Sequence, residues 1–498
     1  MHVDSKTVPK KLQEEFARSG VKISRWSAWK AKVHLAGESI EDQAEQFQKI
    51  PDYVEHIKAA DPDAVTEVVL NTVTNTFESV FICPSANQTA WYNSRPFLAV
   101  DGAHTRAAHE NLLLLAAAYD GEDELLIVAW AFVPKEKEST WTWFLRLLDR
   151  ALGGDLNSIR VTILSDRQKG LLNAIREVMP NACEGFCCVH LLRNLTDNYK
   201  ACKNSVEAFF WAAVKAPSKE QFVEAMQALA DNCGVGPANY LNAISHKRWA
   251  TYAFPGRRYG RKSSNIVEIA NAALSAARSL APLDLLSTIY EYEMVKFSER
   301  AAAGQARQDE FTAAATAVFL QEIDKSREYS VLLSVNRAPT WSGLVRHPLQ
   351  KTQDYAVEIE LSDPDDPDGQ LVASCPCNMP KDTDIPCRHA IGLAAECGLV
   401  PRQLITWEYT TSAYQDAYSI PLPAISTTAL EVDADILAPA KKRKRGRPQK
   451  VRMEKGVAAG KKIGGKGTRP CGLCRVPGHL RSKCPNKPPA EEEEEDSD

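Results

Sequence analysis

The stretch RPFLAVD (95–101), together with VTILSD (161–166), decides the fold of this 498-residue chain. Each is a short apolar run that ends in an aspartate. Continuous apolar runs of this length predict strands that are buried on both faces. Between them, residues 112–119 and 125–133 form two more such runs, which are closed by Asp120–Gly121 and by Pro134.

The neighbouring segments alternate between helix and strand. Apolar residues recur at helical spacing over 141–152 and 171–179, and residues 185–189 predict a fifth strand. The order βββαβαβ predicts an α/β fold, with a mixed sheet and helices on its faces. Residues 191–250 show mostly helical spacing.

Three acidic residues are candidates for one site. Asp101 and Asp166 directly follow strands that would bring them to the same sheet edge, and Glu268 lies on a helix that could complete the group. Three clustered carboxylates stay ionised only when cations hold them together, and two Mg²⁺ (or Mn²⁺) ions would supply that charge. Asp after a strand is also typical of an ordinary turn. A basic loop before the helix is a candidate for DNA phosphate contact through Arg257, Arg258, Arg261 and Lys262.

Five segments resemble the transposase domain of Mutator-like elements (MULE), a ribonuclease H-like DDE family. They occur in the family's order and are FESVFICPSA (77–86), RPFLAVDGAH (95–104), ILSDRQKGLLNAI (163–175), FCCVHLLRNL (186–195) and RWATYAFPGRRYGRKSSNIVEIANAAL (248–274). The resemblance covers roughly residues 20–410. It implies a ribonuclease H-like domain at 66–290, with a helical insertion at about 191–262, and catalytic roles for Asp101, Asp166 and Glu268.

The resemblance also covers further positions of the family's motifs. The family's C-x-x-H motif falls on Cys187 and His190, and Asn265 and Asn271 accompany Glu268. Cys187 and His190 fit either local packing or a structural or DNA-contact role beside the active site. We assign residues 1–65 to an N-terminal helical region and 291–350 to a connector of helices and strands.

A first cysteine cluster has metal-ligand spacing. Nine residues lie between the pair Cys375 and Cys377 and the pair Cys387 and His389, a spacing that predicts a closed Cys₃His site for structural Zn²⁺. The alternative is four unrelated residues. The segment resembles a SWIM-type zinc finger, which we place at 351–400.

The C-terminal part is basic and poor in aromatic residues. Residues 441–487 hold 17 Lys and Arg against one acid, so 425–470 is predicted to be a disordered linker. Its motif Arg445, Gly446, Arg447 and Pro448 resembles an AT-hook, which binds the minor groove, and also fits a nuclear localisation signal or a generic basic run.

A second cysteine cluster follows at 471–485. Its four predicted Zn²⁺ ligands, at CCHC-knuckle spacing, are Cys471, Cys474, His479 and Cys484. Knuckles of this kind usually bind single-stranded nucleic acid. An acidic tail at 486–498 ends the sequence.

Composition excludes several classes. No apolar run approaches the ~18 residues of a membrane span, and the first residues lack the apolar region of a secretory signal. We therefore expect a soluble nuclear protein without a membrane partner, in which the 13 cysteines do not form a disulfide scaffold and the two cysteine clusters are metal sites.

The predicted function is that of a DDE transposase. It would cleave and join DNA at transposon ends and at target DNA, and it is expected to work as a homo-oligomer. The alternative is a domesticated relative that binds DNA as a transcription regulator without cutting it.

Overall fold

The computed structural model describes residues 40–107, 111–200, 205–349, 354–363 and 369–439. The AT-hook-like motif, the CCHC knuckle, the acidic tail and most of the predicted N-terminal helical region lie outside the described residues. None of the described helices is long and apolar enough to cross a membrane.

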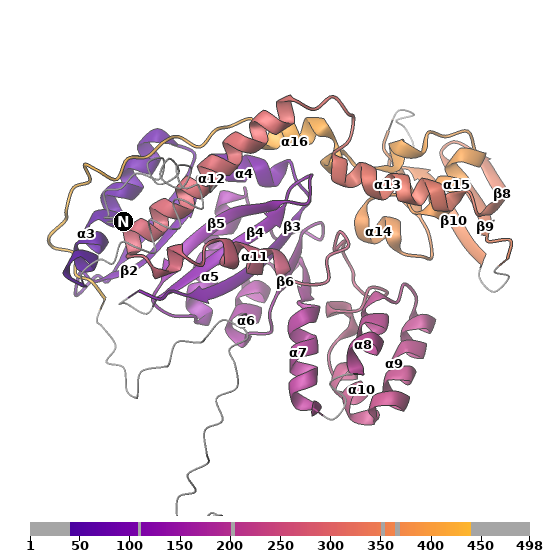
Figure 1. Ribbon diagram of the computed structural model, residues 1–498, viewed down its shortest axis with the longest axis horizontal. Helices are drawn as coiled ribbons and strands as arrows, with labels where there is room; N and C mark the ends of the chain where they lie inside the picture. The colour runs from indigo at the N-terminus through magenta and orange to yellow at the C-terminus, as the bar shows by residue number, and fades with distance from the viewer. Residues whose placement is uncertain (1–39, 108–110, 201–204, 350–353, 364–368, 440–498) are drawn as a thin grey trace, which may run out of the picture. The chain divides into compact units, whose positions relative to one another are not determined.

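A seven-stranded mixed sheet forms the centre of the fold (Figure 1). Its order is β1-β2-β5-β4-β3-β6-β7, in which β1 to β5 pair antiparallel and β3, β6 and β7 pair parallel. The strands are β1 Val65–Leu70, β2 Phe77–Cys83, β3 Phe97–His104, β4 Leu112–Tyr119, β5 Leu125–Val133, β6 Thr162–Ser165 and β7 Cys183–Phe186. Every residue of β4 and β5 is buried, as continuous apolar runs predict. The predicted α/β fold is confirmed.

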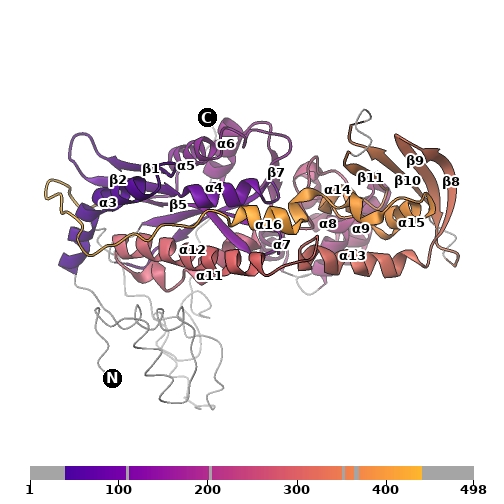
Figure 2. The ribbon, with the colours of Figure 1, turned by 90° about the horizontal axis from the view of Figure 1, so that it is seen from above.

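Helices cover both faces of this sheet. Figure 2 shows α5 (Glu138–Ala151) and α6 (Lys169–Val178) on one side, and α11 (Asn265–Ala273) and α12 (Pro282–Gln305) on the other. The apolar residues of α5 form one stripe, and Trp141, Phe144 and Leu148 are fully buried. The long helix α3 (Ile40–Ala60) packs beside α12 and β1, and the short helix α4 (Ser85–Tyr92) packs on β5.

Among the described residues, four α-helices lie between β7 and α11 in the chain. They are α7 Cys188–Asn198, α8 Val206–Lys215, α9 Lys219–Cys233 and α10 Val235–Asn242. They have an apolar core of their own, in which the ring of Trp249 stacks on that of Phe210 at a centroid distance of 6.1 Å. The chain returns from this bundle to the sheet through residues 249–264.

A second, smaller sheet follows α12 and α13 (Ala313–Ser326). Its antiparallel order is β11-β10-β9-β8, and α15 packs on β8, β9 and β10. The elements are β8 Ser330–Arg337, β9 Thr340–Arg346, β10 Asp354–Leu361, β11 Leu371–Ser374, α14 Met379–Thr383 and α15 Arg388–Glu396. We call residues 330–396 the cysteine module, because it contains the first cysteine cluster.

The last described segment corrects one prediction. The sequence predicts a disordered linker from residue 425 onward, yet Leu430 and Ile436 are buried in the main core. Phe77 donates its backbone N–H to the carbonyl of Leu437 at 2.9 Å. After α16 (Thr411–Ala417), the chain therefore runs back along the core. These two buried side chains and the backbone contact with Phe77 hold the segment against the core.

A buried acid on α12 should shape the stability of the fold. Glu293 is fully buried and accepts a hydrogen bond from Asn87 Nδ2 at 3.2 Å. Burial raises the pKa of Glu293 to about 8, against the opposing charge of Arg300. The folded protein thus holds a proton that the unfolded chain releases above about pH 4.3. The buried Glu293 therefore does not reduce the free energy of unfolding below about pH 4.3. Above that pH the free energy of unfolding falls, and the fall is complete once the pH has risen through about 8.

We therefore predict that Glu293→Gln removes this part of the pH dependence. The melting temperature of the variant should rise relative to that of the wild type between pH 5 and 8, for a free-energy change on the order of a few kcal/mol. Thermal unfolding monitored by circular dichroism across this range provides the measurement. Parallel curves for the two proteins would show that Glu293 does not titrate in this way.

Candidate active site

Two of the predicted acids meet at one edge of the central sheet. β3 and β6 are parallel neighbours, and Ala99 pairs with Leu164. Two residues further along each strand come Asp101 and Asp166. Asp166 begins the turn into α6, where its Oδ1 accepts the backbone N–H of Gln168 at 3.0 Å. The turn interpretation thus holds for Asp166, whose carboxylate also lies close enough to Asp101 to raise the pKa of that residue.

Burial and a neighbouring carboxylate change the pKa of Asp101. Burial raises the pKa of Asp101 to about 6, the negative charge of Asp166 adds to the rise, and the backbone N–H of Gly102 opposes it. Two carboxylates in one partly buried place repel each other unless a cation lies between them. Carboxylate oxygens are also the ligands that Mg²⁺ prefers. The donor set at this edge therefore fits a divalent ion.

Helix α11 brings an amide to Asp101 and carries the third predicted acid one turn earlier. α11 packs against β3, β4 and β5. Its Asn271 donates from Nδ2 to Asp101 Oδ2 at 3.1 Å, while its amide Oδ1 is buried without a partner among the described residues. Glu268 precedes Asn271 by three residues, so it lies on the same helix face. An unpartnered amide oxygen beside Asp101 adds one more oxygen donor to this edge.

The Glu268 carboxylate is turned toward a histidine. Its Oε1 lies 3.5 Å from His190 Nε2, and the two side chains are 38% and 25% exposed. Cys187, at the start of α7, completes a group in which one ligand atom from each residue lies within 4.8 Å of the others. The structure therefore brings the C-x-x-H pair and the acid together.

The electrostatics of this group favour charge on His190. Contact with the Cys187 thiol raises the pKa of His190, and the carboxylate of Glu268 adds to the rise. Burial would raise the pKa of Cys187, but hydrogen bonds to His190 and Ser264 lower it overall. His190 also acts on Asp101, whose pKa its positive charge lowers. His190 is thus electrostatically linked to both Glu268 and Asp101.

A fourth carboxylate lies at this edge, and the sequence reasoning missed it. Glu136 follows β5 and accepts a hydrogen bond from Trp141 Nε1 at 3.2 Å. Its carboxylate lies 3.6 Å from the position that a Cβ on Gly102 would take, next to Asp101. Burial raises the pKa of Glu136, and Asp166 contributes to the rise. The only signal in the sequence was an acid after a buried strand, and Pro134 separates it from that strand.

The basic loop has partners within the chain. Arg257 Nε donates to Asp384 Oδ1 at 2.7 Å, and Arg261 Nη2 pairs with Asp123 Oδ1 at 2.5 Å. Lys262 pairs with Asp382, and Arg258 is fully buried beside the same acid. Arg258 has no exposed surface for a phosphate, so the predicted DNA contact at this residue is wrong. Arg257 and Arg261 keep exposed surface, and Lys262 keeps a little.

The first cysteine cluster converges in the cysteine module. Its four residues offer ligand atoms within 4.8 Å of one another, namely those of Cys375, Cys377, Cys387 and His389. His389 Nδ1 lies 3.5 Å from Cys375 Sγ and 3.7 Å from Cys387 Sγ. Hydrogen bonds from the neighbouring thiols lower the pKa of Cys377 and so favour its thiolate. Three thiols and an imidazole form the donor set that tetrahedral Zn²⁺ prefers.

Neighbouring side chains hold these ligands in place. The ring of Tyr355 stacks on His389 at a centroid distance of 3.7 Å. Cys387 begins α15 and accepts the N–H of Ala390 at its sulfur. Arg388, which follows Cys387 in the chain, donates two hydrogen bonds from its guanidinium to Glu322 on α13, at 3.0 and 3.1 Å. Such supporting contacts are expected around a structural metal site.

The seven-stranded mixed sheet and the helices on its faces are those of a ribonuclease H-like α/β fold. The comparisons agree with this class. Residues 97–194 match the family model described as the MULE transposase domain, a range that contains Asp101, Asp166, Cys187 and His190 and ends before Glu268.

Three known proteins are similar to parts of the chain. The transposase for insertion sequence element IS256 in transposon Tn4001, from Staphylococcus aureus and from Enterococcus faecalis, is 30% identical over 128 residues. That alignment covers 23% of this chain and 31% of each transposase. The protein FAR-RED IMPAIRED RESPONSE 1 of Arabidopsis thaliana is 21% identical over 152 residues, or 30% of this chain and 18% of that protein. The alignments thus cover less than a third of the length of each of these proteins.

Proposed function

We propose that this chain is a MULE-type DDE transposase that cleaves and joins DNA phosphodiesters at transposon ends. The observation that carries the proposal is the meeting of Asp101 and Asp166 at one sheet edge, inside the segment that matches the MULE transposase domain. Glu268 is the proposed third carboxylate. Fold alone would not support an activity, but acids in this arrangement offer a specific chemistry.

The proposed roles follow from the contacts. Two Mg²⁺ (or Mn²⁺) ions bound here would activate a water or a 3′-hydroxyl and stabilise the leaving oxygen. Asp101 and Asp166 would be the main ligands, and Asn271 orients Asp101 through its 3.1 Å hydrogen bond. His190 holds the Glu268 carboxylate at 3.5 Å, and this carboxylate would be a further metal ligand. Arg257 and Arg261, where exposed, would contact phosphate.

A second candidate function is DNA binding without cleavage. The similarity to the Arabidopsis protein, whose name does not describe a transposase, favours a domesticated transcription regulator. The intact acids favour the enzyme. The two candidates predict different products from the same DNA.

The test uses purified full-length protein and supercoiled DNA that carries the gene's own flanking sequences. The enzyme predicts nicks or joined products in Mg²⁺ or Mn²⁺, none in EDTA, and ends that map to the element's termini. The regulator predicts a protected footprint on the same DNA and no broken strands in any metal.

The cysteine clusters complete the proposal. Cys375, Cys377, Cys387 and His389 would hold structural Zn²⁺ in a SWIM-type finger at 351–400. The CCHC knuckle at 471–485 would hold a second Zn²⁺ and contact single-stranded nucleic acid.

The basic segment with Arg445–Pro448 would bind the minor groove and direct the protein to the nucleus. Assembly of transposon ends would require a homo-oligomer.

The contact of His190 with Glu268 yields a separate prediction. His190→Ala should lower the rate of metal-dependent cleavage by roughly 10- to 100-fold, because residues that orient metal ligands commonly have effects of that size. Single-turnover cleavage of the flanking DNA gives the rate. His56→Ala, at an exposed histidine on α3, is the matched control and should cleave like the wild type. Equal rates for the wild type and His190→Ala would refute the orienting role.

A further inference from the structure

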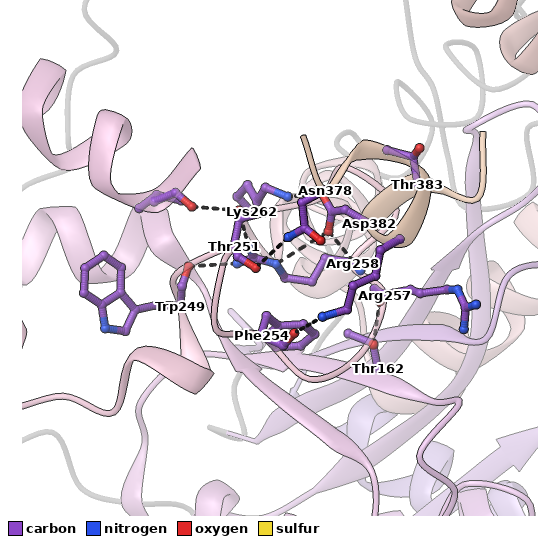
Figure 3. Close-up of polar contacts among 12 residues, drawn as sticks. Thr162, Trp249, Thr251, Phe254, Arg257, Arg258, Lys262, Asn378, Asp382 and Thr383 are labelled. Atoms are coloured by element: carbon purple, nitrogen blue, oxygen red, sulfur yellow. Dashed lines mark hydrogen bonds and ion pairs between the residues drawn. The ribbon is translucent and has the colours of Figure 1, made fainter. Parts of the chain in front are cut away.

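The loop that leads into α11 is held by the cysteine module (Figure 3). Asn378 Nδ2 donates to the carbonyl of Thr251, and Lys381 Nζ donates to that of Phe254, both at 3.1 Å. Asp382 accepts the backbone N–H of Arg258 and pairs with Lys262. A five-residue helix, α14, with its capping residue Asn378, thus binds the 251–264 loop through both backbone and side chains.

Charge makes Asp382 the central residue of this contact. Its carboxylate is 12% exposed and lies between Arg258, which is fully buried, and Lys262, which is 14% exposed. The Arg258 guanidinium is also held by the Trp249 carbonyl at 2.8 Å and by Thr251 Oγ1 at 2.5 Å. Without Asp382, two largely buried cations would face each other without an acid, which is a strongly destabilising arrangement.

The loop has little freedom on its other side. The Arg257 carbonyl accepts from Thr162 Oγ1 in β6, and the Lys262 carbonyl accepts from the N–H of Cys188 in α7. A Cβ on Gly256 would lie 2.6 Å from Cys183 Sγ. The loop is therefore packed between the central sheet and α14, and Glu268 follows Lys262 by only six residues.

We propose that Asp382 is a positioning residue for the active site: by holding the 251–264 loop, it sets the place of α11 and hence of Glu268 and Asn271. This inference rests on the proposed function, because Glu268 matters only if the acids act together. The cysteine module would then contribute to the active site by positioning two of its residues. The cluster ligand Cys377 directly precedes Asn378, so the proposed Zn²⁺ site shapes the same short helix.

The test measures hydrogen–deuterium exchange of the full chain, which requires no cleavage activity. Asp382→Asn should raise exchange in peptides from 255–273 by about tenfold, while peptides from β4 stay protected, because only local opening is affected. Lys262→Met should have a similar effect, and adding it to Asp382→Asn should change little more. Asp382→Glu should recover part of the protection. Asp354→Asn removes an exposed pair with Arg346 in the same module and is the matched control.

Two results would overturn the proposal. One is unchanged exchange over 255–273 in Asp382→Asn. The other is equally faster exchange throughout the chain in both Asp382→Asn and Lys262→Met, since the proposed effect is local. If the wild type cleaves DNA, the variant should also cleave about 10- to 100-fold more slowly with unchanged DNA affinity, because a small displacement of a reacting group has that effect. A wild type that does not cleave contradicts the proposed function and leaves the exchange result decisive for Asp382.

Discussion

Asp166→Asn is expected to abolish DNA cleavage while the protein remains folded and bound to DNA. The amide keeps the Oδ1 atom that accepts the N–H of Gln168, so the turn into α6 should persist. It removes the charge that, with Asp101, would attract divalent ions. Metal ions contribute several kcal/mol of transition-state stabilisation, so we expect a loss of about a thousandfold or more in rate. Time courses on DNA that carries the gene's flanks, beside binding by fluorescence anisotropy, provide the measurement.

The matched control is Asp416→Asn, at an exposed acid on α16. It should cleave like the wild type. If Asp166→Asn cleaves as fast as this control, then Asp166 is not part of the catalytic site. A variant that loses DNA binding along with cleavage would instead place Asp166 in the DNA interface.

The second large effect concerns the cysteine module. Cys387→Ser should lose one Zn²⁺ per chain and unfold the segment around α14 and α15, because Cys387 is both a proposed ligand and the first turn's cap. Structural zinc binding contributes roughly 10 kcal/mol or more to the folding of small segments, so the removal of one ligand should be severe. Zinc content by atomic spectroscopy and limited proteolysis between residues 354 and 400 measure the effect.

Cys397→Ser offers a close control. Cys397 lies at the end of α15 in the same module but outside the ligand group. It should keep the wild-type zinc content and proteolysis pattern. Equal zinc content in Cys387→Ser and Cys397→Ser would show that the cluster does not bind the metal.

The central sheet could be predicted because its signals are local. The runs at 112–119 and 125–133 are apolar throughout, which predicts strands buried on both faces. The strands in the structure begin and end at the same residues. Asp101 and Asp166 could be paired because parallel strands end at one edge. The four cysteine-cluster residues could be grouped because ligand spacing lies in a short segment.

Contacts across long separations could not be predicted in this way. The basic loop had the composition of a phosphate-binding segment, but Asp382 lies 120 positions after Lys262 and nothing local links them. Glu136 was missed because only the fold brings it beside Gly102. The burial of Leu430 and Ile436 was missed because composition reports a segment's average, whereas packing depends on individual side chains.

The proposal that the acids bind catalytic metal ions is tested most directly by counting the Mn²⁺ ions bound at this site. Electron paramagnetic resonance would compare Mn²⁺ titrations of the wild type, Asp101→Asn and Asp416→Asn, each with a short DNA duplex. We expect the wild type and Asp416→Asn to bind Mn²⁺ alike and Asp101→Asn to lose the tight site. Identical titration curves for the wild type and Asp101→Asn would contradict the proposal.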